Sequence, residues 1–164
     1  MRLGVILGLY LNVPEAQLSD RVTREHRNRV WWTAYDFDQL LASRLGQSAS
    51  VQDGDIQVDL PSSVGLPESV QGDYTDAESL VAHTKLAELA GQITQSLYGR
   101  RTQKEPFSQR VQQALKKLQG WVRNLPDRLQ FEKHQSSQPV PHPIRALRLS
   151  FNQVRTIKVL GSMP

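Results

Sequence analysis

The chain has 164 residues and a formal net charge of +4, with 38% hydrophobic and 22% charged residues. This balance is typical of a globular protein rather than a disordered one, and the length suits a single domain. The chain contains no cysteine, which excludes a disulfide framework, a thiolate zinc site and a cysteine nucleophile. It also contains no run of about 18 apolar residues, so the sequence predicts no membrane-spanning helix.

The first residues are apolar and allow two interpretations. Residues 4–10 resemble the end of a buried helix that stops before Pro14. With Met1 and Arg2 in front of it, the same stretch is also compatible with a signal peptide, removed at about Ala16 from a small secreted helical protein. The buried helix is favoured because no small-x-small cleavage motif follows. Since both chain ends are apolar helices, we expect an array that is incomplete at both ends.

A second helix is predicted from about Asp20 to Leu45, with Gly46 as its left-handed cap. Helical periodicity predicts that its core-facing side contains Val30, Ala34, Phe37, Leu41 and Leu45, widened by Trp31, Tyr35 and Ala42. The opposite stripe contains Asn28, Trp32, Asp36, Gln39 and Ser43. Trp32 is therefore expected either to be covered by another segment or to be an exposed anchor for a partner.

Charged residues of this helix give two further expectations. Asp38 falls between apolar positions, so we expect it to be partly buried, with a cation or a helix N-terminus beside it. Four arginines spread around the helix rather than lining one side. Solvation or ion pairs within the domain are therefore favoured over a nucleic-acid patch for Arg21, Arg24, Arg27 and Arg29.

The rest of the chain is predicted to alternate between helices and connections. An extended strap follows from residue 47 to Pro61, and then an exposed loop over residues 62–74. A capping box at 75–78 begins a third helix that ends at Gly99. Its apolar side contains Leu86, Leu89, Ala90, Ile93 and Leu97.

Two more helices complete the predicted array. The fourth opens at Pro106 and stops at Pro126, and a mobile connection over residues 135–142 leads to the last, which starts at Pro143. The fourth helix carries an apolar stripe of Phe107, Val111, Leu115, Leu118, Val122 and Leu125. The last carries Ile144, Leu147, Phe151, Val154 and Ile157.

The sequence predicts neither a metal site nor an enzyme. The four histidines, His26, His83, His134 and His142, form no pair at helical spacing. Residues 53–55 (Asp-Gly-Asp) resemble a fragment of a calcium loop, but a turn is the favoured interpretation. No nucleophile-elbow or phosphate-binding motif occurs. Arg100, Arg101 and Lys104 form a short basic cluster that suits a targeting signal or a helix C-terminus equally well.

Residues 26–38, HRNRVWWTAYDFD, resemble the signature of the fungal-specific transcription factor domain, the middle homology region of zinc-cluster regulators. In that family an Arg-rich turn precedes a Trp pair, an aromatic position and an Asp. The similarity continues through 40–46 and through 53–61, where the family shows an acidic pair, Ile, Val and a closing Leu-Pro. The motif residues are Arg27, Arg29, Trp31, Trp32, Tyr35, Asp38, Gly46, Asp55 and Pro61.

Weaker similarity lies on both sides of this motif, and a few positions depart from the family pattern. Leu-Gly-Leu-Tyr at 7–10 and the stretches 118–126 and 147–152 are similar to looser family patterns. Asn28, Gln39 and the pair at 47–48 stand where the family tends to have Arg, Arg and Arg-Pro. The sequence after Asn152 diverges.

The resemblance implies an all-α helical array, with one extended strap and two loose loops, that regulates transcription in the nucleus. The regulatory domain would span residues 1–164, with its core motif at 26–61. Its implied partners are transcriptional cofactors or the rest of a larger regulator, and a small-molecule effector between helices is possible. Alternatives are the secreted protein described above and a truncated, non-functional remnant of the family.

The resemblance assigns DNA and zinc binding to a six-cysteine cluster of full-length family members. Because this chain has no cysteine, we expect it to hold no zinc and no other cofactor, and to make no direct contact with nucleic acid.

Overall fold

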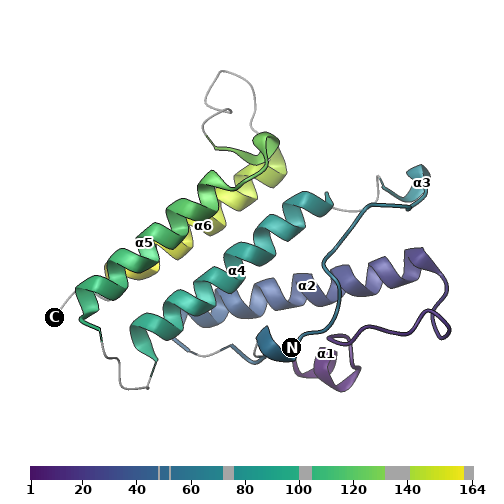
Figure 1. The fold of residues 1–164 in the computed structure, drawn as a ribbon, viewed down its shortest axis with the longest axis horizontal. Helices are drawn as coiled ribbons and strands as arrows, with labels where there is room; N and C mark the ends of the chain where they lie inside the picture. Colours follow the sequence, from purple (N-terminus) through teal and green to yellow (C-terminus); the bar gives the residue numbers. More distant parts are fainter. Residues whose placement is uncertain (48, 52, 72–75, 100–104, 132–140, 161–164) are drawn as a thin grey trace.

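The computed structural model describes residues 1–47, 49–51, 53–71, 76–99, 105–131 and 141–160. These residues form six α-helices and two short 3-10 helices and contain no β-strand, which confirms the predicted all-α class. Helix α4 is central and packs against α2, α5 and α6, and α2 also contacts α6 (Figure 1). No helix within the described ranges is long and apolar enough to span a membrane.

Helix α2 spans Arg21–Arg44, close to the predicted range, because both of its ends are capped. The carboxylate of Asp20 accepts hydrogen bonds from the backbone amides two and three residues later, at 3.3 and 3.0 Å. At the other end Gly46 adopts the left-handed region with φ of +61°. The amide of Gln47 then donates to the carbonyl of Ala42 over 2.9 Å, as in a Schellman motif.

Helix α4 spans Ala77–Tyr98 and ends at Gly99, as predicted. Its cap differs from the prediction, since Thr75 lies outside the described residues and Asp76 is the N-cap. The Asp76 carboxylate accepts a hydrogen bond from the backbone amide three residues later at 2.9 Å. Glu78 pairs with Arg128 at 2.5 Å. The five apolar residues predicted for its inner side are all buried.

Helix α5 spans Phe107–Arg123 behind Pro106, so it begins where predicted. Its inner side is narrower than the predicted stripe. Leu118 is buried, whereas Phe107 and Leu115 remain 36% and 40% exposed. After α5 the chain forms a 3-10 helix, η2, at Asp127–Leu129.

Helix α6 spans His142–Leu160 and begins one residue before the predicted Pro143. It buries Ile144, Leu147 and Val154, as its predicted stripe requires. Residues 135–140 of the predicted mobile connection lie outside the described residues, as does the basic cluster at residues 100–104.

The N-terminal helix α1 spans Arg2–Ile6, so it ends earlier than predicted. The strap that follows α2 is extended as predicted, apart from the 3-10 helix η1 at Asp53–Asp55. Its residues 57 and 58 donate their amides to the carbonyl of Tyr10 at 2.9 and 3.0 Å, which ties the strap to the N-terminal segment.

Most of the described part of the predicted loop at residues 62–74 is exposed, with two features that the sequence did not predict. Helix α3 forms at Glu68–Gln71, and Leu66 is buried with 6% of its surface exposed. The apolar Leu66 side chain anchors this stretch to the domain, a contact that the Ser/Gly/Pro-rich composition does not reveal. Residues 72–74 lie outside the described residues.

The core consists of two clusters that meet at α4. The larger cluster joins α4, α5, η2 and α6 around Leu86, Leu118 and Leu147. The smaller one packs the aromatic residues of α2 against the N-terminal segment, the strap and Ala87 of α4. Leu40 of α2 contacts both clusters.

The predicted core side of α2 is wrong. Val30, Ala34, Phe37, Leu41 and Leu45 are exposed, and Phe37 retains 72% of its accessible surface. The predicted polar stripe faces the interior instead. The buried residues of α2 are Glu25, Asn28, Arg29, Trp31, Trp32, Tyr35, Asp36, Gln39, Ala42 and Ser43.

Candidate functional site

The Trp pair of the motif holds two separate segments against α2. Trp31 is fully buried, and its ring lies 5.9 Å from that of Tyr10. A Cβ atom at Gly4 would lie 3.3 Å from the Trp31 ring, so the small residue lets α1 approach closely. Trp31 therefore fixes the N-terminal segment on one side of α2.

Trp32 is covered by the strap, which confirms the first of the two interpretations for this residue. Its exposed fraction is 5%, and its indole Nε1 donates to the carbonyl of Asp59 over 2.8 Å. Its ring meets the edge of Tyr35 with 5.3 Å between the ring centroids. Trp32 is thus part of the packing between helix and strap and not an exposed anchor.

Tyr35 connects the same helix to the beginning of η1. Its hydroxyl donates to Oδ1 of Asp53 over 2.6 Å and accepts from the side-chain amide of Gln39 at 3.1 Å. Burial raises the pKa of Tyr35, and the hydrogen bond with the nearby Asp53 carboxylate raises it further. The Tyr35 hydroxyl therefore stays protonated and remains a donor to the strap.

The arginines make contacts within the domain, as the sequence analysis favoured. Arg29 pairs with Glu25 at 2.6 Å, and both side chains are more than nine-tenths buried. The same Glu25 oxygen accepts the backbone amide of Ser62 at 2.9 Å, so this ion pair also holds the residue that follows the strap. Arg24 donates to the carbonyl of residue 18, and Arg27 donates to the carbonyl of residue 8.

Asp38 has a different partner from the one predicted. It is partly buried, and its carboxylate accepts hydrogen bonds from the backbone amide and the hydroxyl of Ser50, at 2.7 and 2.8 Å. These donors belong to the strap rather than to a cation or a helix N-terminus.

Of the other motif residues, Gly46 caps α2, Asp55 is exposed at the end of η1, and Pro61 is buried where the strap ends.

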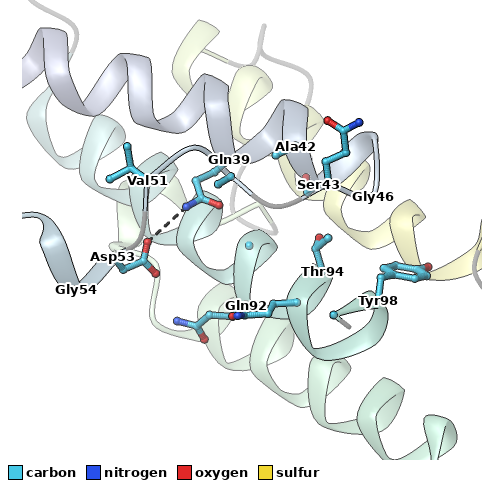
Figure 2. A pocket seen from close by; sticks show the side chains of 15 residues that line it. Gln39, Ala42, Ser43, Gly46, Val51, Asp53, Gly54, Gln92, Thr94 and Tyr98 are labelled. Carbon is cyan, nitrogen blue, oxygen red and sulfur yellow. Dashed lines mark hydrogen bonds between the residues drawn. The ribbon is translucent and has the colours of Figure 1, made fainter. Parts of the chain in front are cut away.

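A cavity of about 350 Å³ lies between the C-terminal half of α2, the strap and the C-terminal half of α4 (Figure 2). Polar uncharged side chains dominate its walls. Gln39 and Ser43 line it from α2, and Thr94 and Tyr98 line it from α4. Asp53 is the one carboxylate among the described lining residues, which include no lysine or arginine.

Gln39 is held in place at the wall of this cavity. Its side-chain nitrogen donates to the Tyr35 hydroxyl at 3.1 Å and lies 3.4 Å from Oδ1 of Asp53. Its carbonyl oxygen lies against Gly91 of α4, where a Cβ atom would collide with it. The glycine thus lets the Gln39 amide approach the α4 backbone.

Thr94 presents a hydroxyl group that has no partner. The residue is 6% exposed, and its Oγ1 is buried without a hydrogen bond among the described residues. Ser43, on the opposite wall, donates its hydroxyl to the carbonyl of Leu40 at 2.8 Å and retains lone pairs that can accept. The Thr94 hydroxyl is therefore enclosed by its neighbours and does not open into the cavity.

Gln39 and Ser43 belong to the stripe predicted to be the polar side of α2, whereas no sequence pattern predicted a role for Thr94 or Gly91. The stripe from Asn28 to Ser43 was the signal that could have revealed them, since a row of mostly polar residues with one Trp suits a buried polar interface.

Asp53 and Asp55 form a 3-10 turn, and no cluster of three metal-ligating side chains occurs within the described residues.

The family model described as the fungal specific transcription factor domain matches residues 1–134 of this chain. The chain is 27% identical over 135 residues to an uncharacterized transcriptional regulatory protein of Schizosaccharomyces pombe, a match that covers 82% of this chain and 17% of that protein. It is 26% identical over 146 residues to the transcriptional activator protein acu-15 of Neurospora crassa, covering 81% and 16%.

A third relative is the thiamine repressible genes regulatory protein thi1 of Schizosaccharomyces pombe, 29% identical over 99 residues, with 60% of this chain and 12% of that protein covered. No solved structure matches the chain significantly. The chain spans about one sixth of the length of the first two relatives. Because the family model covers most of the chain, and the motif residues from Arg27 to Pro61 lie within it, the chain belongs to the fungal specific transcription factor domain family, whose relatives here are transcriptional regulators.

Proposed function

We propose that this chain is a regulatory segment of a nuclear fungal transcription factor and that it acts by packing against another part of the same regulator. The observation that carries the proposal is a row of exposed apolar side chains on α2. We call it the α2 apolar row, and it consists of Val30, Ala34, Phe37, Leu41 and Leu45.

The α2 apolar row lies on the side of α2 opposite its buried residues. Phe37, Leu41 and Leu45 remain 72%, 57% and 61% exposed. A helix at the surface of a domain normally turns its apolar stripe toward the core and its polar residues toward water. Helix α2 buries its aromatic residues together with polar ones and leaves the α2 apolar row exposed, and large exposed apolar surfaces mark interaction sites. A second packing partner for α2 accounts for this arrangement.

The length of the relatives favours another part of the regulator as that partner. About five sixths of each of the first two relatives lies outside the matched stretch. A helix between two packed layers is common in a large helical array, and the buried face of α2 is already covered by the strap and α4. In such a regulator, DNA recognition belongs to a different part of the polypeptide, and transcriptional cofactors contact the assembled array.

A domain exchange with acu-15 tests both the regulatory function and the role of the α2 apolar row. The stretch of acu-15 that matches this chain is replaced by residues 1–164, and transcripts of an acu-15-dependent reporter are measured. We expect the chimera to activate well above a deletion of the same stretch. Phe37→Glu or Leu41→Glu in the chimera should lower activation by about fivefold or more, because a carboxylate buried in an apolar contact costs at least 1–2 kcal/mol.

Leu149→Glu is the matched control, since Leu149 is a 63% exposed leucine on α6, outside the α2 apolar row. It should leave activation unchanged. A chimera no more active than the deletion would contradict the regulatory function. An active chimera in which the Phe37 and Leu149 variants behave alike would contradict the role of the α2 apolar row and leave the regulatory function standing.

A further inference from the structure

The α2 apolar row is narrow and runs along the axis of the helix. Its five members follow one another at steps of four, three, four and four residues, and all are exposed. At about 100° per residue they fall within a stripe about 80° wide, and at about 1.5 Å per residue the stripe is about 22 Å long. A stripe of this shape has the dimensions of a seam between two helices, which is narrower than the face that a helix turns toward a domain core.

The surface of the row has a hollow and a ridge. Ala34 contributes only a methyl group and lies between Val30 and Phe37, each about one turn away. Phe37 stands out from the helix and keeps 72% of its accessible surface. When two helices pack lengthwise, a large side chain of one inserts between four residues of the other. The row therefore offers a hole at Ala34 and a knob at Phe37.

We propose that the α2 apolar row binds a single amphipathic helix from another part of the same regulator, packed lengthwise along α2. A large apolar side chain of that helix inserts above Ala34, and a small residue lies opposite Phe37. The length of the row requires a partner helix of about 15 residues or more. This inference rests on the proposed function and adds the kind of partner and its register.

The size of the row favours a partner that is covalently connected. The row contains five residues, whereas a stable interface between separate chains involves about 20–30 residues on each side. Association from solution also costs translational and rotational freedom, which a segment of the same polypeptide has already lost. These arguments favour a helix of the same regulator over a second copy of this chain.

Photo-crosslinking within the acu-15 chimera tests this contact. p-Benzoylphenylalanine replaces Val30, Phe37 or Leu45 in turn, and crosslinked peptides of the purified chimera are identified by mass spectrometry. We expect intramolecular crosslinks to one acu-15 segment. From each probe to the next, the crosslinked position should move in one direction by about seven or eight residues, because two helices rise equally per residue. An extended partner would move by only about three or four residues, at about 3.3 Å per residue.

The same probe at Leu149 is the matched control, because this exposed leucine of α6 lies outside the row. It should give no crosslink to the segment that the three row probes reach.

Ala34→Leu distinguishes interlocked packing from general attraction between apolar surfaces. The substitution makes the row more apolar but fills the hole, so the crosslink yield from the Phe37 probe should fall by about fivefold or more. Ala34→Ser keeps the residue small and should retain at least about half of the yield. The melting temperature of residues 1–164 should stay unchanged in Ala34→Leu, because the position is exposed and Ala and Leu have similar helix propensities.

Crosslinks between two copies, crosslinks scattered over several segments, steps of three or four residues, or no crosslinks would each overturn the proposal. Equal yields with Ala34→Leu and the original row, or a Leu149 probe that reaches the same segment, would overturn it as well. Crosslinking does not depend on reporter activation. An active chimera that fails these tests leaves the regulatory function standing, and an inactive chimera that passes them contradicts the regulatory function alone.

Discussion

Asp36 is a buried carboxyl residue at the contact between α2 and α4. It is 7% exposed, and its Oδ1 atom has no hydrogen-bond partner within the described part of the chain. Burial raises the pKa of Asp36 from 3.8 to about 8; the neighbouring Thr84 hydroxyl lowers it, and the charge of Glu88 raises it. Among the described residues, the Thr84 hydroxyl nevertheless makes no hydrogen bond of standard geometry. Asp36 is therefore largely protonated at neutral pH.

This raised pKa predicts a loss of stability with increasing pH. The folded state binds the Asp36 proton more tightly than the unfolded state, so the free energy of unfolding falls as pH rises from about 4 to about 8. Asp36→Asn removes the ionisation and keeps the shape. We expect it to match the original chain at pH 4 and to be more stable at pH 8.5 by an amount on the order of a few kcal/mol.

Thermal melts followed by circular dichroism between pH 4 and pH 8.5 measure this difference. Asp55→Asn is the control, because Asp55 is exposed, and it should leave the pH profile unchanged. Burial lowers the pKa of His83, which adds its own pH dependence to every variant and cancels in the comparison. A constant difference between Asp36→Asn and the original chain at all pH values would refute the assignment of the shifted pKa to Asp36.

At the scale of the helices, the ends were predictable and one inner face was not. Asp20, Gly46, Gly99 and Pro106 mark helix ends because capping depends on a few neighbouring residues and on backbone conformation. The N-cap of α4 lies one residue after the predicted position. Thr75 and Asp76 are both favourable N-cap residues, so the sequence alone does not decide between them.

The inner face of α2 was assigned to the wrong side because both of its sides carry a helical pattern. The α2 apolar row is aliphatic apart from Phe37, whereas the buried side mixes aromatic and polar residues. Some of its polar groups have distant partners in the strap, such as Asp53 and Asp59, which periodicity cannot reveal. For the same reason Asp38 was predicted to be the buried carboxylate, while Asp36 is the more buried of the two.

The candidate cavity was hidden from the sequence for a related reason. Gln39 and Ser43 belong to the stripe assigned to solvent, and Thr94 stands between the buried residues Ile93 and Leu97 of α4 without any local signal. Their proximity depends on how α2 and α4 cross. The family resemblance predicted the fold class and the transcriptional role, but it carried no information on this contact.

The left-handed conformation at Gly46 predicts a specific cost of substitution at the end of α2. With φ of +61°, a Cβ atom would meet the strain that L-residues have in this region, although no other atom of the described residues lies within 4 Å of it. Gly46→Ala should therefore lower the free energy of unfolding by about 1–2 kcal/mol in urea titrations.

Gly120→Ala is a control that should change the free energy of unfolding in the opposite direction. Gly120 lies inside α5, its Cβ position is also in open space, and its φ is not positive. Gly120→Ala should raise the free energy of unfolding by about 0.5–1 kcal/mol, because alanine loses less conformational freedom in a helix. Equal effects of the two substitutions would mean that Gly46 does not adopt the left-handed conformation.

At the scale of the whole molecule, α4 joins the two core clusters. It contributes Leu86 and its neighbours to the larger cluster and Ala87 to the smaller one, and it packs against α2, α5 and α6. Leu40 of α2 contacts both clusters as well. A shared central helix leaves neither cluster with a complete core of its own, so we expect the two to unfold together.

The three tryptophans allow this cooperativity to be measured, because Trp31 and Trp32 report on the smaller cluster and Trp121 packs against the larger one. Leu86→Ala removes a fully buried side chain from the larger cluster and should destabilise the chain by about 2–5 kcal/mol. All three indole N–H signals should then lose their native positions at the same, lower temperature, roughly 5–15 °C below that of the original chain. Leu149→Ala, at a 63% exposed position, should shift the transition by less than about 0.5 kcal/mol. If only the Trp121 signal moved to lower temperature in Leu86→Ala, the clusters would be independent units and α4 would not couple them.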